Sequence, residues 1–522
     1  MSNDVTEEFS NLRAMLWPIH RRELRKFLPL LLLIFFIAFN YNTLRTMKDT
    51  LVVATGKSSG AEVIPFIKVW VMFPGSILMT WVFARLCNRL SRENVFYVML
   101  GVFITYFATF VLVLYPNSET IHPHAFADSL QSVLPLGLKG FVAMIRNWSF
   151  TIFYAVAELW GNIVLFLLFW GFANQVTHLS EAKRFYSILG IGANIAGIIA
   201  AQISQTISGV GYLPWIPYGT RAWDQQMMFL VGLVILTGFA AMAVFRWMHT
   251  HALDAESGET VAAVKGEVKG KMSMWKSFKE LFTSPYLLSL AIIAIGYNIV
   301  INLVEVPWKH QMHEMLPNPS DYNRYMNQVL MMIGFIATFA AFFVTNNVIR
   351  LFGWTFTAMM TPVLLLLTSA LFFTSFFFKE NLHGLAATLL GSTPLALVVF
   401  FGTVQNCIAR GAKYTVYDTT KEIAFVPLPQ DTKIRGKAVI DGVCTRLGKS
   451  GGSIIHQILL ISFSSVAGSL PYIAICIVAT LAVWMVALIY MGRQFNALAA
   501  QEGSAEPVPA PTASKQEPVL QA

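Results

Sequence analysis

Four charged residues lie inside long apolar segments of this chain, where charge is costly. Lys68, Glu158, Glu305 and Lys449 each fall in or beside a run of roughly 20 mostly apolar residues, the length that crosses a bilayer. Charge at such depth is usually retained for a pathway, a binding site or an ion pair. The ammonium groups suit phosphate or carboxylate, and the carboxylates suit an internal cation, a substrate donor or a proton. The structural alternatives are helix–helix clamps and lysines that reach to the interface.

The neighbours of these charges refine the chemistry. Lys449 stands in Leu447-Gly-Lys-Ser-Gly-Gly452, whose glycines allow backbone to approach a ligand closely. The Gly-Lys-Ser triplet is shared with P-loops, but Val443 occupies the position where that motif needs its first glycine. Arg45 and Lys48 follow the first apolar segment one helical turn apart, which indicates either a phosphate clamp or an interfacial cap on that segment.

Composition identifies the apolar runs as membrane spans. Of 522 residues, 56% are hydrophobic and only 12% are charged, whereas soluble domains carry about 25% charged residues. The runs are too long and too uniform for barrel strands, so we predict an all-α integral membrane protein. A window of about 19 residues predicts about twelve spans. They are 27–44, 64–84, 95–115, 147–172, 187–207, 226–246, 284–304, 326–349, 354–378, 385–408, 438–463 and 469–491.

The loops predict a domain plan and an orientation. Lysines and arginines concentrate in alternate loops, and the positive-inside rule then places both termini in the cytoplasm. One long polar break separates two blocks of six spans, the plan of major-facilitator-type transporters. The predicted units are a cytoplasmic N-terminal segment (1–26), a six-helix half (27–249), a cytoplasmic central loop (250–280), a second six-helix half (281–493) and a disordered cytoplasmic tail (494–522).

Several absences narrow the function. The net charge of +9 lies largely in short loops and sets orientation, so we expect no nucleic-acid partner; the lipid bilayer is the expected surroundings. The four cysteines show no metal-ligand spacing. No G-x-S-x-G elbow or H-E-x-x-H helix is present. We therefore expect no enzyme activity, no metal site and no bound cofactor.

At these residues the chain resembles the non-mitochondrial ATP/ADP translocases of obligate intracellular bacteria and plastids. The likeness covers roughly residues 10–495, and its motifs include Ala61-Glu-Val-Ile-Pro-Phe-Ile-Lys-Val-Trp70, Ala157-Glu-Leu-Trp-Gly161, Asn302-Leu-Val-Glu305 and Leu447-Gly-Lys-Ser-Gly451. The resemblance implies exchange of host ATP for bacterial ADP, or uptake of another nucleotide, across the inner membrane of an obligate intracellular bacterium. Family members depend on two lysines and two glutamates, which by motif correspond to Lys68, Glu158, Glu305 and Lys449.

Two departures from the family pattern leave the substrate choice open. The usual Leu-Arg-Asp-Thr-Lys-Asp reads Leu44-Arg-Thr-Met-Lys-Asp49 here, and Cys444-Thr-Arg-Leu447 adds Arg446. Both make the neighbourhood more positive, and Arg45, Lys48 and Arg446 become candidate additional phosphate contacts. The alternatives are a proton-coupled net importer that also takes GTP, UTP or CTP, and a membrane enzyme with a phosphorylated donor.

The partners implied by this reading are nucleotides. Whether Mg²⁺ accompanies them is open, and a monomer is the expected working unit. Tyr154 and Trp160 are the candidate aromatics for stacking on the base.

Overall fold

The computed structural model describes residues 19–57, 60–177, 179–253, 281–343 and 345–504, and this part of the chain contains helices and no strand. Most of the predicted N-terminal segment, of the central loop and of the tail lies outside the described residues. Helices are expected, since only they and closed barrels satisfy every backbone donor and acceptor within a bilayer.

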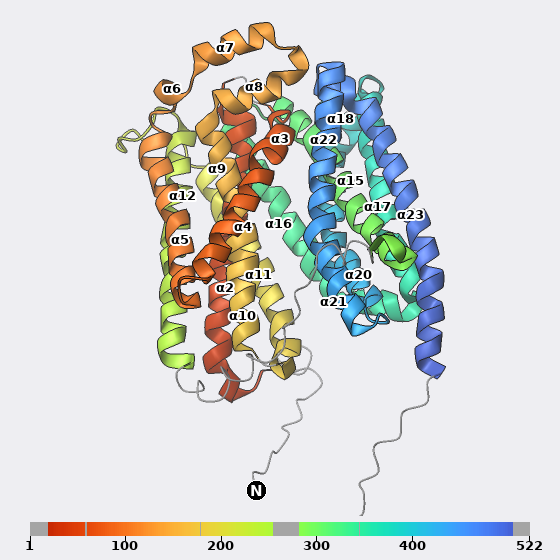
Figure 1. Cartoon of the computed structure of the whole chain (residues 1–522). Helices are drawn as coiled ribbons and strands as arrows, with labels where there is room; N and C mark the ends of the chain where they lie inside the picture. Colours follow the sequence, from red (N-terminus) through yellow and green to blue (C-terminus); the bar gives the residue numbers. More distant parts are fainter. Residues whose placement is uncertain (1–18, 58–59, 178, 254–280, 344, 505–522) are drawn as a thin grey trace, which may run out of the picture.

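The helices that precede the central gap pack together on one side of the molecule, and we call them the N-terminal bundle (Figure 1). Short helices α6 to α8 cap the end of the bundle at which α2 ends. The bundle comprises α2 (Leu24–Thr50), α3 (Val63–Phe66), η3 (Ile67–Met72), α4 (Phe73–Cys87), α5 (Arg92–Thr109), α6 (Ser118–Ile121), α7 (His124–Val133), α8 (Lys139–Arg146), α9 (Trp148–Leu159), η6 (Trp160–Phe169), α10 (Trp170–Val176), α11 (Leu179–Ser208) and α12 (Ala222–Met248).

The helices after the central gap form a second group, the C-terminal bundle (Figure 1). Within it α15 packs against α19, α22 and α23, and across to the other bundle α16 packs along α11. Its members are α15 (Pro285–Met315), α16 (Pro319–Phe343), α17 (Thr345–Phe377), α18 (His383–Leu390), α19 (Pro394–Ala412), η9 (Lys413–Tyr417), α20 (Asp418–Ala424), α21 (Gln430–Val439), η10 (Ile440–Cys444), α22 (Thr445–Phe463) and α23 (Val466–Ser504).

Ten helical segments among the described residues are long and apolar enough to cross a membrane. The predicted spans 326–349 and 438–463 are not among these ten. They correspond to α16 and to α21–α22, and in α22 the residues Arg446, Lys449, His456 and Gln457 lower the mean hydropathy. Both α16 and α22 nevertheless lie in the bundles, against α11 and α15 respectively.

Several predicted boundaries were wrong, and two of them matter for the site. The first span does not end at 44, because α2 continues to Thr50, which places Arg45 and Lys48 inside the helix and buries Lys48. The seventh does not end at 304, because α15 continues to Met315. The tenth begins at Pro394, since residues 383–390 form the separate helix α18. Hydropathy windows end where charges begin, even when the helix continues.

Side chains of the two bundles meet near the C-terminal end of α2, where α16 begins. Thr46 and Thr50 of α2 donate to Asn327 and Asn323 of α16, each over 3.1 Å. We call this end the joined end.

The joined end also holds α22 against α3. The Gln457 amide of α22 donates to the Pro65 carbonyl at 2.9 Å and accepts from the Trp70 indole at 3.2 Å. A β-carbon added at Gly137, in the turn before α8, would stand 2.3 Å from the Leu460 carbonyl, so this turn also lies against α22.

Candidate functional site

Glu305 is the centre of an ion network that joins the two bundles. Its carboxylate accepts from Lys68 of η3 at 3.0 Å, from Lys309 of α15 at 2.8 Å and from Arg410 of α19 at 3.3 Å. Lys68 also donates to the Asn302 amide oxygen, one turn before Glu305. Three cations around one carboxylate leave an excess of positive charge, which attracts an anion. The structure thus brings Lys68 and Glu305 together, although they lie far apart in the sequence.

A second acidic group extends the network into α2. The Asp49 carboxylate lies 2.8 Å from the Lys309 ammonium and 3.1 Å from that of Lys48. Lys48 also lies 3.3 Å from Glu158 and 3.8 Å from the centroid of the Tyr154 ring. Lys48 is therefore not an interfacial cap, because an ion pair, a second carboxylate and a cation–π contact hold it inside the protein.

Lys449 and Arg45 differ from the other cations, because no described carboxylate lies within ion-pair distance of either. Both nevertheless interact electrostatically with Glu158, and both with Tyr414. Lys449 and Tyr414 are solvent-exposed and Arg45 is half-buried. These side chains therefore line an accessible space inside the molecule. Unpaired cations in such a space are ready receptors for an anionic ligand.

The position of Lys449 follows from the glycines that flank it. A β-carbon at Gly448 would stand 2.7 Å from the Ile295 carbonyl oxygen, and one at Gly452 would stand 2.9 Å from Asn302. The pair forms a G-x-x-x-G contact of the kind that lets two membrane helices approach closely. One turn later, the His456 Nε2 donates to the Asn302 carbonyl at 3.2 Å. The backbone of α22 is thus fixed on α15.

Arg446 lies three residues before Lys449 on the same helix and is exposed. Residues three apart on a helix are neighbours on its surface. Arg446 is therefore a neighbour of Lys449 on the surface of α22, and it is not among the cations that contact Glu305.

Wide helical turns occur beside several of these residues, although not beside Glu305 or Lys309. Lys68 lies inside the π-helical turn 67–72, Glu158 just precedes 160–169, and Asp49 just precedes 51–55. The turns 413–417 and 440–444 likewise follow Arg410 and precede Lys449. Such turns are rare in proteins and are frequent at functional sites.

Sequence reasoning missed Lys309, Arg410 and the central role of Asp49. Lys309 follows Glu305 by four residues, the spacing at which helix side chains pair, but the predicted span ended at 304. Arg410 stood two residues beyond the predicted end of the tenth span. Both residues could have been found from the sequence if each predicted helix had been continued past the charged residues at its end.

The two predicted stacking aromatics have other contacts. Trp160 is fully buried, donates to the Ile37 carbonyl at 3.1 Å and packs edge-on to Phe103. Tyr154 is 1% exposed and faces Lys48. Neither ring is free to stack on a base, so that prediction was wrong.

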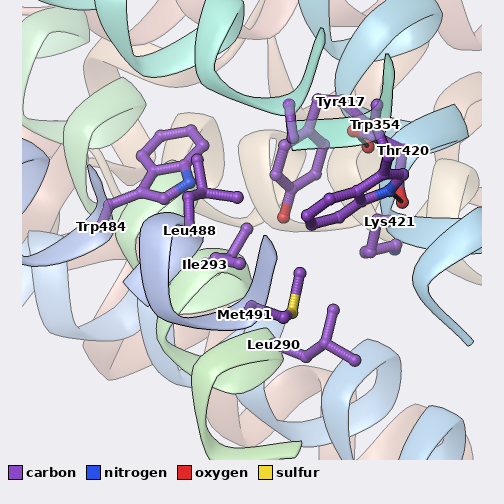
Figure 2. Close-up of a pocket in the computed structure, with 10 residues that line it drawn as sticks. Leu290, Ile293, Trp354, Tyr417, Thr420, Lys421, Trp484, Leu488 and Met491 are labelled. Atoms are coloured by element: carbon purple, nitrogen blue, oxygen red, sulfur yellow. Dashed lines mark hydrogen bonds between the residues drawn. The ribbon is translucent and has the colours of Figure 1, made fainter. Parts of the chain in front are cut away.

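A small cavity lies within the C-terminal bundle (Figure 2), and none of the residues of the ion network lines it. Trp354, Tyr417 and Trp484 line it together with Lys421. Its polar groups are mostly engaged, since the Trp354 indole donates to the Thr420 carbonyl at 2.9 Å and Lys421 pairs with Asp441 at 2.6 Å. The walls are mostly apolar, and among the lining groups the Trp484 indole nitrogen is buried without a partner, so this is a small packing space and not a charged site.

Two helical bundles that enclose a cation-rich, partly accessible cluster define a solute transporter of the major-facilitator architecture. Solved structures agree on this fold. A bacterial homologue of the iron transporter ferroportin, in an inward-facing state, matches with a TM-score of 0.54 over 90% of this chain and 98% of its own, at 13% identity. A D-xylose–proton symporter matches with a TM-score of 0.54 over 90% and 97%, at 12% identity. At such identities the likeness shows the fold alone.

The chain belongs to the TLC ATP/ADP transporter family, whose model matches residues 2–495. It is 42% identical over 505 residues to ADP,ATP carrier protein 1 of Chlamydia trachomatis serovar D, covering 96% of this chain and 94% of that protein. It is 37% identical over 504 residues to ADP,ATP carrier protein 1 of Rickettsia bellii (95% and 99%). It is 40% identical over 480 residues to the chloroplastic ADP,ATP carrier protein 2 of Arabidopsis thaliana (92% and 76%). The family is one of transporters, which removes the enzyme alternative.

Proposed function

We propose that this protein exchanges ATP for ADP across a bacterial inner membrane by alternating access of its two bundles around the central cluster. The observation that carries the proposal is the excess of cations over carboxylates around Glu305 and Glu158, at a depth where uncompensated charge is costly. A nucleotide's phosphates supply the missing negative charge.

The four predicted residues take two kinds of role in this proposal. Lys449 and Arg45 are the first phosphate contacts, because they face accessible space without a carboxylate partner. Lys68 and Lys48 are held by Glu305 and Glu158 in the empty site. An entering polyanion competes with these carboxylates for the lysines, which loosens the Lys68–Glu305 contact between the bundles. Arg446 guides the phosphates toward Lys449.

The proposal includes the predicted plan of the chain. Residues 27–249 and 281–493 act as the moving halves, and 1–26, 250–280 and 494–522 lie in the cytoplasm. The joined end then faces the outside, and Lys449, which lies near the start of α22, is approached from the cytoplasm. One chain suffices for transport, because the cluster is built within it.

The alternative is proton-coupled net import of nucleoside triphosphates. Glu158 favours it, because its side chain is 31% exposed and, among the described residues, Lys48 is the one cation within ion-pair distance of it. A carboxylate of this kind can take up a proton when the substrate leaves.

Purified protein in liposomes separates the two. We expect uptake of labelled ATP only when ADP or ATP is trapped inside, with no effect of a protonophore. Uptake into empty liposomes that a protonophore abolishes would establish net import instead. Competition by GTP, UTP and CTP reports the base choice.

Charge removal tests the site assignment in the same assay. Lys449→Ala and Glu305→Ala should abolish exchange while the protein still inserts in the membrane. Wild-type exchange rates in both variants would refute the assignment.

A further inference from the structure

The segment that carries Lys68 is held by one glutamine of the opposite bundle. Gln457 of α22 is buried, with 8% of its surface exposed, and its amide contacts the chain on both sides of Lys68. Its Nε2 donates to the Pro65 carbonyl at 2.9 Å, before Lys68 in the chain. Its Oε1 accepts from the Trp70 indole at 3.2 Å, after Lys68. Both hydrogen-bonding ends of the amide are therefore used on the segment that presents Lys68.

These contacts fall where the helical hydrogen bonding changes. The helix α3 ends at Phe66 and the π-helical turn 67–72 follows, so backbone bonds to the fourth residue give way to bonds to the fifth. The change interrupts the regular ladder, and buried carbonyls beside it need other donors. Gln457 supplies such a donor to Pro65. It therefore stabilises the wide turn in which Lys68 contacts Glu305 at 3.0 Å.

The preceding residue of α22 holds the other partner of Lys68. The His456 Nε2 donates to the Asn302 carbonyl, and the amide oxygen of Asn302 accepts from Lys68. His456 thus contacts α15 of its own bundle, whereas Gln457 contacts the N-terminal bundle. When the bundles separate at the joined end, the Gln457 contacts must break and the His456 contact can persist.

The cap supports the same segment from within the N-terminal bundle. The Phe141 ring of α8 lies edge-on to Trp70, with centroids 6.2 Å apart, and edge-on to Phe66 at 6.1 Å. A β-carbon at Gly140 would stand 2.4 Å from the Glu62 carbonyl oxygen, so α8 lies close against the chain before α3. The cap belongs to the same bundle as Lys68 and moves with it, whereas Gln457 does not.

We propose that Gln457 is a positioning residue for Lys68. While the joined end is closed, Gln457 holds the π turn in the form that sets Lys68 against Glu305 and Asn302. When the joined end opens, Gln457 releases the turn, and Lys68 becomes available to phosphate that enters from that side. The inference rests on the proposed function and adds the residue that links the state of the joined end to the state of Lys68.

The first test measures a distance that does not depend on transport. Spin labels are attached to cysteines placed at Phe73, which is exposed just after the π turn, and at Ile458, which is exposed beside Gln457. The four native cysteines are replaced by serine. Without nucleotide, the wild type should show mainly one short distance, because the joined end is closed. In Gln457→Leu the ratio of short to longer distances should fall about tenfold, since two hydrogen bonds of the closed form are lost.

The second test is exchange by intact bacterial cells that express the chain, where external ATP reaches one face only. Gln457→Leu should lower the maximal rate about tenfold, because the return to the closed form is impaired. It should also lower the KM for external ATP, because the form open to that side becomes more populated. A variant that is merely unstable would lose rate in proportion to its folded amount and keep its KM.

Gln225→Leu is the matched control. Gln225 is also buried and also uses both ends of its amide, donating to the Leu213 carbonyl at 2.9 Å and accepting from the Leu213 N–H at 2.8 Å, but within one bundle. Its loss should lower the melting temperature and leave the label distances and the KM unchanged. Wild-type distances in Gln457→Leu, or a raised KM, would overturn the inference.

Trp70→Phe tests the same contact from the other bundle, because it removes the indole N–H and keeps a ring. It should shift the distances in the same direction by a smaller factor, and Gln457→Leu/Trp70→Phe should shift them no further than Gln457→Leu, since the two residues share one contact. Additive shifts would contradict the proposed role. If Gln457→Leu does not insert, wild-type distances in Trp70→Phe overturn the inference.

Failure of the proposed function has a different signature. If the wild type exchanges no adenine nucleotide, the proposed function fails, while the label distances still decide whether Gln457 holds the turn that carries Lys68.

Discussion

At the scale of single residues, Lys309 forms ion pairs that link the two bundles. Its side chain is 1% exposed, and its ammonium lies 2.8 Å from Asp49 of α2 and 2.8 Å from Glu305 of its own helix. A buried cation between two carboxylates compensates both, so its removal leaves like charges facing each other in a poorly solvated place.

Lys309→Met should therefore abolish exchange and lower the melting temperature in detergent, because breaking a buried pair costs about 3–5 kcal/mol. The double variant Asp49→Asn/Lys309→Met removes one of the two facing carboxylates, while Lys48 keeps its contact with Glu158, and should regain most of the lost stability. Scanning fluorimetry of both variants checks this. A double variant no more stable than the single one would contradict the assigned ion pair.

Arg45 is expected to act on binding. Arg45→Gln should raise the KM for ATP by about tenfold or more, since a charge-assisted contact to phosphate is lost, while the amount of inserted protein stays constant. Arg45→Lys should recover only part of the affinity, because an ammonium cannot bind two oxygens side by side. Arg89→Gln removes an equal charge from an exposed loop and should leave the KM unchanged.

At the scale of helices, the sequence predicted membrane spans well and their ends poorly. Lys68, Glu158, Glu305 and Lys449 were identifiable because each falls in or beside an apolar run. Lys309 and Arg410 were not, because charged residues terminate a hydropathy window while backbone hydrogen bonding continues the helix, as in α15 and α19. The pairing of Lys68 with Glu305 depends on how two bundles meet, which no local pattern encodes.

The packing of α22 on α15 gives a prediction about glycine. Gly448→Ala should reduce exchange severely and lower thermal stability, because the added carbon would meet backbone of α15 within 2.7 Å. Gly451→Ala is the matched control in the same helix, since its β-carbon would meet nothing within 4 Å. Equal loss in both would mean that helix flexibility, and not close contact, explains the glycines.

The cap formed by α6 to α8 should be sensitive to acid. Burial and the nearby His124 lower the pKa of His122 from 6.5 to about 4, although Glu119 acts in the opposite direction. His122 therefore stays neutral in the folded protein and bonds Ser149 at 2.7 Å. Its contribution to stability is present above pH 6.5 and declines as the pH falls toward 4, where the unfolded state alone takes up the proton.

His122→Gln removes this titration and keeps a polar group near Ser149. We expect the melting temperature to fall less between pH 7 and pH 5 in the variant than in the wild type, by melting in detergent across that range. Parallel curves would exclude His122 as the titrating group.

At the scale of the whole molecule, we predict that a covalent link between the bundles at the joined end stops transport. Cysteines at Thr50 and Asn323, whose side chains now lie 3.1 Å apart, should be linked by a short bifunctional thiol reagent. The link should stop exchange, because the bundles could no longer separate there, and a reducible linker should restore it on reduction. Either single cysteine with the same reagent should retain activity. Full exchange in the linked protein would show that this end never opens.

The glycine contact between α22 and α15 has a consequence for motion. Lys449 and Glu305 belong to two helices that are packed tightly against each other. We therefore expect the distance between these two residues to stay fixed when the bundles move. Lys68 belongs to the other bundle and must change its distance from both. A pair of spectroscopic labels on α22 and α15 should therefore report one constant distance throughout turnover. The distance from a label beside Lys68 to either of them should change each time the bundles move.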